Sequence, residues 1–240
     1  MLFGCGLAAG TINTLAGGGS LLTVPALVLL GLPGTLANGT NRVGVLASNL
    51  VAAWRFRAQG VSGMREALPV LLPAALGSGV GAFAIARMGD VAFERLYGLV
   101  MLALVLPMLR PPRTAVTGAK RRSPPRAVIV VLFFVVGLYG GAIQAGIGLA
   151  FVAALSYAGH DLVRASAIKV AVIAAYTAVA VAVFAWQGKI QWSAAAVLAP
   201  GFALGGELGA RLAVVGGERV IRMALAGAVV ALAGRMLGLY

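Results

Sequence analysis

Eight apolar runs, separated by short breaks of charged residues, proline and glycine, occupy most of the chain. Six of them are 19 to 25 residues long, and a helix needs about 20 apolar residues to cross the hydrocarbon core of a bilayer. Only 10% of the residues are charged, whereas a soluble domain uses about a quarter. The pattern therefore predicts an all-α integral membrane protein and excludes a soluble or disordered chain. The runs cover residues 2–31, 36–58, 67–86, 91–109, 127–158, 162–186, 193–214 and 219–239.

The charged residues are strongly unbalanced: 19 Lys and Arg stand against 6 Asp and Glu, a net charge of +13. They lie between the apolar runs, where basic residues set membrane orientation and attract anionic headgroups, so we expect the lipid bilayer rather than nucleic acid as their partner. One cysteine, Cys5, and one histidine, His160, cannot form a disulfide or a His/Cys metal cluster. The sequence also holds no paired carboxylates and no nucleophile with a base. We therefore expect no enzyme, no metal site and no cofactor.

Two runs, 2–31 and 127–158, are too long for one crossing, and glycines interrupt both. The first is broken at Gly17–Gly19 and the second between Gly140 and Gly148. We expect each run to form two half-length helices joined by an unwound segment, arranged as a re-entrant hairpin. Two short tilted crossings are the alternative, and the sequence leaves it open.

A basic, proline-rich linker, residues 110–126, separates two halves of similar length. It holds six basic residues and four prolines, and both its charge and its prolines exclude a buried helix. The chain therefore divides into a first transmembrane repeat, 1–109, this linker, and a second transmembrane repeat, 127–240. We expect each repeat to contain one glycine-broken unit and three transmembrane helices.

The two halves match each other along their length. An offset of 128 residues aligns one ordered series of positions, and an offset of 131 aligns the glycine-broken units. A single match means little in a chain so rich in glycine and alanine, but the ordered series predicts a duplicated half. The matched positions include Asn38 with Ser166, Asn41 with Lys169, Gly77 with Gly205, Gly81 with Gly209 and Asn13 with Gln144.

The basic residues predict how the halves are oriented, because they prefer the cytoplasmic side. If each broken unit enters and leaves the membrane on one side, 14 basic residues fall on the side of the linker and 5 on the other. If each broken unit crosses once, the split is 11 to 8. The first arrangement follows the rule better, and it makes the halves inverted, the linker cytoplasmic and both termini external. Inverted repeats with broken helices are typical of secondary transporters.

Two stretches in each half follow a pattern known from one membrane protein family. The first half reads GLAAGTINTLAGGGSLLTVPALVLLG (Gly6–Gly31) and ANGTNRVGVLASN (Ala37–Asn49). The second reads GLYGGAIQAGIG (Gly137–Gly148) and RASAIKV (Arg164–Val170), without the triple glycine. Here the chain resembles the TauE/SafE sulfite exporter family, over nearly its whole length. The resemblance implies a multi-pass protein of the inner membrane that moves sulfite, organosulfonates or related sulfur anions.

The predicted substrate site lies where the broken helices meet. Unwound backbone at Gly17–Gly19, and the helix start at Ser20, would present N–H groups and partial positive charge to an anion; close helix packing is the alternative. Asn38 and Asn41 either cap the next helix or contact the substrate. Lys169 would neutralise the anion, unless it snorkels to the headgroups. The predicted binding residues are Asn13, Gly17, Gly18, Gly19, Ser20, Asn38, Asn41, Gln144, Gly146, Gly148, Ser166 and Lys169.

Two other charged residues bear on the mechanism. Glu207 is the one acid well inside an apolar run, and it either carries protons or pairs with Arg211 four residues on. Arg42 follows Asn41 at the outer end of a run, and we expect it to snorkel. The sequence thus predicts a secondary transporter that exports sulfite or an organosulfonate by alternating access, with proton coupling at Glu207 left open. A passive anion channel, or a transporter of another small anion such as a carboxylate, is the alternative; a homo-oligomer also stays open.

Overall fold

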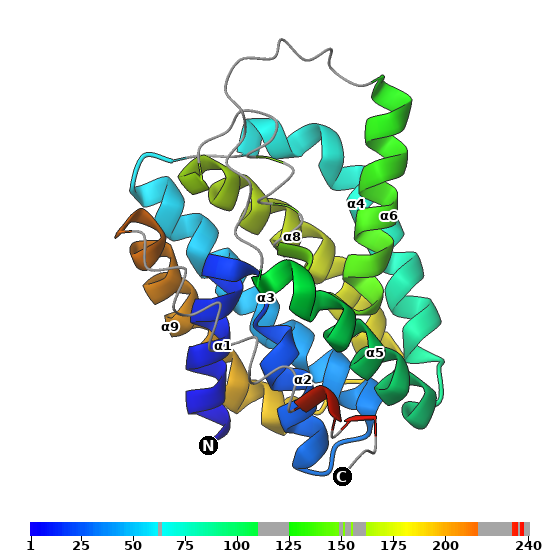
Figure 1. The fold of residues 1–240 in the computed structure, drawn as a ribbon. Helices are drawn as coiled ribbons and strands as arrows, with labels where there is room; N and C mark the ends of the chain where they lie inside the picture. The colour runs from blue at the N-terminus through cyan, green and yellow to red at the C-terminus, as the bar shows by residue number, and fades with distance from the viewer. Residues whose placement is uncertain are drawn as a thin grey trace.

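The structure, a computed structural model, describes residues 1–61, 64–109, 125–148, 151, 155, 162–215, 232–234 and 236–237. Every regular element in this part of the chain is an α-helix (Figure 1), which confirms the predicted all-α class. Linker residues 110–124, most of the run 219–239, and His160 lie outside the described residues. The helices are α1 (Leu2–Ala16), α2 (Ser20–Leu29), α3 (Gly34–Ala58), α4 (Met64–Ala86), α5 (Asp90–Leu109), α6 (Arg126–Ala142), α8 (Leu162–Trp186) and α9 (Trp192–Val215).

Apolar side chains cover the outward faces of the long helices. On α4, the residues Leu68, Leu72, Leu76 and Val80 recur every four positions and are all exposed, so they form one stripe along the helix. Water would not favour such a stripe, and lipid would. Within the described residues, three helices are long and apolar enough to cross a membrane, over residues 67–86, 163–186 and 192–213.

Both predicted glycine breaks interrupt a helix. α1 ends before Gly17, whose backbone is left-handed (φ 70°), and α2 begins at Ser20. Beyond the end of α6, Gln144 (φ 63°) and Gly146 (φ 68°) are left-handed as well. In Figure 1, α1 rises from the lower end of the molecule and α2 runs back to it, as in a re-entrant hairpin. α1 has 15 residues and so reaches about 22 Å, short of a hydrocarbon core of roughly 30 Å.

The halves pack their helices through matching contacts. α1 packs against α9, and α6 packs against α4, with glycines so close to the facing backbone that a Cβ would collide with it. Four glycine contacts of the first pair have a counterpart in the second, and adding 131 to the α1 numbers and subtracting 124 from the α9 numbers converts one into the other. The matched contacts are Gly6–Leu198 with Gly137–Ala74, Gly10–Phe202 with Gly141–Ser78, Gly201–Phe3 with Gly77–Phe134, and Gly205–Leu7 with Gly81–Leu138.

This packing places α4 and α9 one helical turn away from the alignment expected from the sequence. The sequence offset of 128 pairs Gly81 with Gly209, but the contacts pair Gly81 with Gly205. A shift of four residues keeps the same face of a helix, so the glycine pattern alone does not separate the two registers. The offset of 131 between the broken units agrees with their contacts.

The two breaks touch each other directly. A Cβ at Gly17 would collide with the Cα of Gly148, and a Cβ at Gly148 would collide with the Cα of Gly17. These positions are 131 residues apart, which is the offset predicted to align the two broken units. α3 and α8 also contact each other, and both helices carry buried polar side chains.

Candidate functional site

Two basic side chains, Arg42 of α3 and Lys169 of α8, have no exposed surface. Lys169 Nζ donates a hydrogen bond to the carbonyl of Thr14, near the end of α1, at 2.6 Å. The Arg42 guanidinium donates to the carbonyl of Gly140, near the end of α6, and to Gln144 Oε1. Each cation therefore reaches from one half to the C-terminal end of the other half's broken helix, where the helix dipole is negative.

The prediction that Arg42 snorkels is wrong. α3 begins at Gly34, directly after Pro33, so Arg42 lies about 12 Å from the N-terminal end of the helix rather than at that end. The guanidinium carbon lies 5.7 Å from the ring centroid of Phe184, and Nη2 lies 3.4 Å from Asn38 Oδ1. The hydrogen-bond acceptors of Arg42 are neutral, and in the part of the chain that the structure describes no carboxylate pairs with it.

Burial also rules out the snorkelling alternative for Lys169. Its ammonium ends at the carbonyl of Thr14, inside the protein, rather than at the headgroups. Ser166, three residues earlier on α8, is 6% exposed and so belongs to the same buried region. That Lys169 neutralises a bound anion stays a prediction.

Asparagine side chains connect α3 to both broken units. Asn41 Nδ2 donates to Ser20 Oγ at 3.0 Å, and Asn41 Oδ1 accepts from the hydroxyl of Thr23. Asn38 Nδ2 donates to the carbonyl of Ala142 at 2.8 Å. The capping alternative is wrong for both asparagines, because α3 begins several residues earlier and they lie inside it.

The amides of the two broken units, Asn13 and Gln144, make matching contacts. Asn13 Nδ2 donates to Ser48 Oγ on α3 at 3.1 Å, and Gln144 Nε2 donates to Thr177 Oγ1 on α8 at 3.3 Å. Gln144 is also the one residue other than glycine with positive φ in the described part of the chain. Such a backbone costs about 1–3 kcal/mol and tends to persist at functional sites.

The glycines of the predicted site are buried, and most of them pack tightly against neighbouring residues. Gly17 and Gly148 pack against each other, Gly19 packs against the carbonyl of Ala9, and Gly146 packs against Leu104 of α5. Close packing, the alternative given for these glycines, therefore accounts for their lack of a side chain. Gly18 is buried as well, and anion binding by this backbone stays a prediction.

Sequence reasoning missed three polar contributors. Ser48 and Thr177 hold the two amides, and Tyr97 of α5 donates to the carbonyl of Ser20 at 2.7 Å. The alignment of the halves could have indicated Thr177. The offset of 128 aligns it with Asn49, so that α3 and α8 both carry a polar residue at this level.

Glu207 takes part in none of these hydrogen bonds. It forms an ion pair with Arg211 on the same helix, and the two side chains are 27% and 54% exposed. The structure therefore contains the ion pair that the sequence offered as the alternative to proton transfer.

Substituting Glu207 by glutamine should leave the pH profile of transport unchanged. A partly exposed pair at i, i+4 contributes about 0.3–0.5 kcal/mol to a helix, so stability should change little as well. Transport by Glu207→Gln and by the parent, measured across the same pH series in proteoliposomes, checks this. A displaced profile in Glu207→Gln would instead restore proton coupling at this carboxyl.

A second polar network ties the start of α3 to α5 and to the α8–α9 loop. The N–H and the hydroxyl of Thr35 donate to Asp90 Oδ1 at 2.9 and 2.6 Å, and Lys189 Nζ donates to Thr35 Oγ1 at 3.0 Å. Burial by itself raises the pKa of Asp90, but these hydrogen bonds and the charge of Lys189 hold the pKa below its ordinary value. The Asp90 carboxylate thus stays ionised, and Thr35 connects it to Lys189 of the α8–α9 loop.

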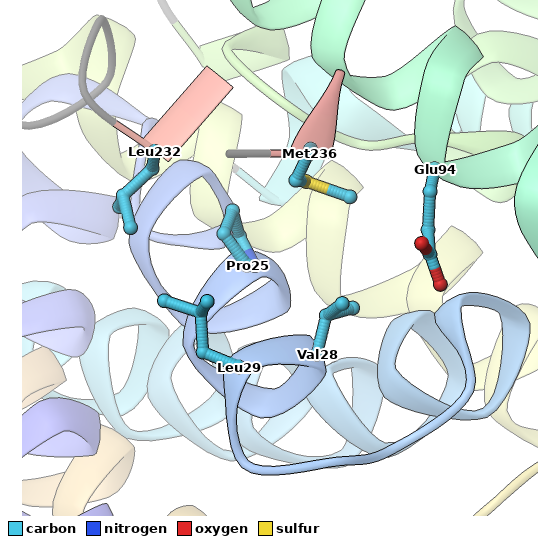
Figure 2. A pocket seen from close by; sticks show the side chains of 6 residues that line it. All are labelled: Pro25, Val28, Leu29, Glu94, Leu232 and Met236. Carbon is cyan, nitrogen blue, oxygen red and sulfur yellow. The ribbon is translucent and has the colours of Figure 1, made fainter. Parts of the chain in front are cut away.

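A cavity of about 230 Å³ lies between α2, α5 and the described residues near the C-terminus. Figure 2 shows Glu94 as the one charged side chain in an otherwise apolar lining. None of the predicted binding residues lines it, so the cavity is separate from the buried polar contacts. In the described ranges no group of three His, Cys, Asp or Glu side chains could hold a metal ion. The lining residues are Pro25, Val28, Leu29, Glu94, Leu232 and Met236.

Apolar outer faces, interrupted helices and buried cations and amides define a multi-pass membrane protein with a polar interior, the class to which membrane transporters belong. The chain belongs to the sulfite exporter TauE/SafE family, whose sequence profile matches residues 2–236. The predicted family resemblance is thereby confirmed.

Curated relatives agree with this assignment. The chain is 28% identical to the "Probable membrane transporter protein" of Haemophilus influenzae over 92% of its own length and 88% of the relative's. It is 27% identical to the "Probable membrane transporter protein ORF9" of a Sinorhizobium species, over 98% and 91% of the two chains. It is also 27% identical to the "Probable membrane transporter protein YfcA" of Escherichia coli K12, over 92% and 83%. No solved structure matches the chain.

Proposed function

We propose that this protein is a secondary transporter that exports a small sulfur-containing anion, sulfite or an organosulfonate, by alternating access. The observation that carries the proposal is the burial of two basic side chains, Arg42 and Lys169, at the ends of the two broken helices. Ionisable residues inside a membrane are costly and mark substrate pathways by default. Positive charge there suits an anion, and the family description names sulfite.

Alternating access is proposed to use two inverted repeats. Two observations support this: four glycine contacts between α1 and α9 have counterparts between α6 and α4, and Gly17 touches Gly148, which lies 131 residues later. In Figure 1, α1 begins at the lower end of the molecule and α6 begins at the upper end. Repeats that run in opposite directions let the same contacts close one side of the membrane or the other.

Lys169 is proposed to neutralise the bound anion. Its ammonium lies at the end of α1, next to the break at Gly17–Gly19, and Asn13, Asn41 and Gln144 are the amides that would donate to the anion's oxygens. The backbone at Gly146–Gly148 would complete the site from the second half. All three amides are buried or nearly so, which favours strong hydrogen bonds to a charged ligand.

Transport by the purified protein in liposomes tests the function. A transporter coupled to a proton gradient should accumulate sulfite against its concentration gradient, whereas a passive channel should only equilibrate it. The same vesicles loaded with a carboxylate test the other alternative. The rise in melting temperature with sulfite, thiosulfate, methanesulfonate and acetate should rank these anions as substrates. If the protein neither binds nor transports a sulfur anion, the proposal is wrong.

The orientation can be checked with introduced cysteines. In a Cys5→Ala background, a cysteine at Thr117 should resist an impermeant thiol reagent in intact cells, because the linker is expected in the cytoplasm. A cysteine at Tyr240 should react, because both termini are expected outside. The reverse labelling pattern would overturn the orientation and with it the charge argument for inverted repeats.

A further inference from the structure

Two buried hydrogen-bond donors lie next to one residue of α6 and have no acceptor. The Nε of Arg42 is buried without a partner, although the same guanidinium donates to the carbonyl of Gly140. The hydroxyl of Tyr176 on α8 is also buried without a partner, and it lies 3.0 Å from the position that a Cβ would take at Gly140. Roughly 90% or more of buried polar groups have a partner, so two such groups around one glycine require an explanation.

The missing group must be an acceptor. The Nε–H of Arg42 can only donate, and the phenolic O–H of Tyr176 donates as well as accepts. Arg42 also brings a positive charge whose hydrogen-bond acceptors are neutral oxygens. In an apolar interior such a charge is stabilised by an anion, and guanidinium groups favour the oxygens of carboxylates and related oxyanions.

The unpartnered hydroxyl is not a general feature of the tyrosines inside this bundle. Tyr97 donates to the carbonyl of Ser20 at 2.7 Å, and Tyr139 donates to the carbonyl of Ala145 at 2.6 Å. Tyr176 is fully buried like Tyr97, yet no acceptor faces its hydroxyl. This tyrosine therefore marks a specific position rather than loose packing.

We infer that Arg42 and Tyr176 form an oxyanion subsite beside Gly140, where the Arg42 Nε–H and the Tyr176 hydroxyl donate to oxygens of the transported anion. The inference rests on the proposed function and adds to it a second positive centre, besides Lys169. It also sets the chemical class: an anion with at least two acceptor oxygens, in preference to a halide. The side chain of Gln144 accepts from a different nitrogen of the same guanidinium, Nη1, so it leaves the Nε–H to the anion.

Tyr176→Phe tests the subsite without disturbing the fold, because the hydroxyl that it removes has no partner. Its melting temperature without ligand should match or exceed that of the parent. Its Kd for sulfite should rise about tenfold or more, as expected for one lost hydrogen bond to a charged group. Tyr139→Phe is the matched control: it removes a hydroxyl that has a partner, so it should lower the melting temperature and leave the Kd for sulfite unchanged.

Arg42→Lys is the second variant, since it keeps the charge and removes the guanidinium fork; sulfite binding should again weaken at least tenfold. If Arg42→Lys does not fold, Tyr176→Phe still decides. A parent that binds sulfite, together with a Tyr176→Phe protein of unchanged Kd, overturns the subsite while the proposed function stands. Chloride that binds as tightly as sulfite overturns the oxyanion class, and a parent that binds no sulfur anion overturns both the subsite and the function.

Discussion

Replacing Gly17 by alanine should prevent the two broken units from packing together. The added methyl would collide with the backbone of Gly148, which cannot rotate away as a side chain could. Alanine would also have to keep the left-handed backbone of Gly17 (φ 70°), at a cost of about 1–2 kcal/mol. Overpacking of a tight contact adds about 1–3 kcal/mol. We expect Gly17→Ala to give little monodisperse protein and the lowest melting temperature among the glycine variants.

Three other glycines separate the causes of this effect. Gly148→Ala makes the same backbone collision without a left-handed φ, whereas Gly31→Ala must adopt φ 93° but meets nothing within 4 Å. Gly4→Ala has neither problem and should be neutral or stabilising, since alanine favours helix over glycine by about 1 kcal/mol. Melting temperatures in detergent should therefore fall in the order Gly4, Gly31, Gly148, Gly17. A Gly17→Ala protein as stable as Gly4→Ala would contradict the contact between the breaks.

The helical class and the glycine breaks could be predicted because both are local properties of the chain. Apolar runs of membrane length predict helices whatever surrounds them, and Gly17 ends α1 with a left-handed residue that glycine favours. The second break is less local. α6 ends at Ala142, inside the predicted range, but the left-handed positions include Gln144, a residue that gives no such signal in a sequence.

The position of Arg42 could not be predicted, because snorkelling and burial differ only in what lies across from α3. The side chain is buried by α6, which follows about a hundred residues later, and its acceptors at Gly140 and Gln144 come from there. A weak signal was present: at an offset of 127, one less than the best alignment, Arg42 matches Lys169. The predicted alignment of the halves thus places the two buried cations one residue apart in register.

The capping alternative places the start of α3 too late in the chain, and this error also has a local cause. Asn38 and Asn41 are good capping residues, and the sequence places a cap wherever such a residue precedes an apolar run. α3 instead begins at Gly34, after Pro33, whose fixed φ suits the first position outside a helix. The polar residues therefore lie inside the helix, where only tertiary contacts determine whether they pack or bind.

Replacing Lys169 by methionine should abolish sulfite transport and reduce sulfite binding by about a hundredfold or more, as when one partner of a buried charge pair is removed. Methionine keeps the length of the side chain and removes its charge. Without ligand, two effects oppose each other. The hydrogen bond to the carbonyl of Thr14 is lost, but a charge no longer has to be held away from water. The ligand-free melting temperature should therefore change little, while the stabilisation by sulfite disappears.

The matched control is Lys189→Met, the same substitution in the α8–α9 loop. Lys189 also donates a hydrogen bond, to Thr35 Oγ1 at 3.0 Å, but this acceptor lies at the start of α3 and not at the end of a broken helix. Lys189→Met should keep the parent's affinity and transport rate. If Lys169→Met melts at a much lower temperature yet retains the parent's Kd for sulfite, then Lys169 only stabilises the end of α1. Its role as the anion's counter-charge would then be wrong, since a charge that neutralises the substrate cannot be removed without weakening the substrate's binding.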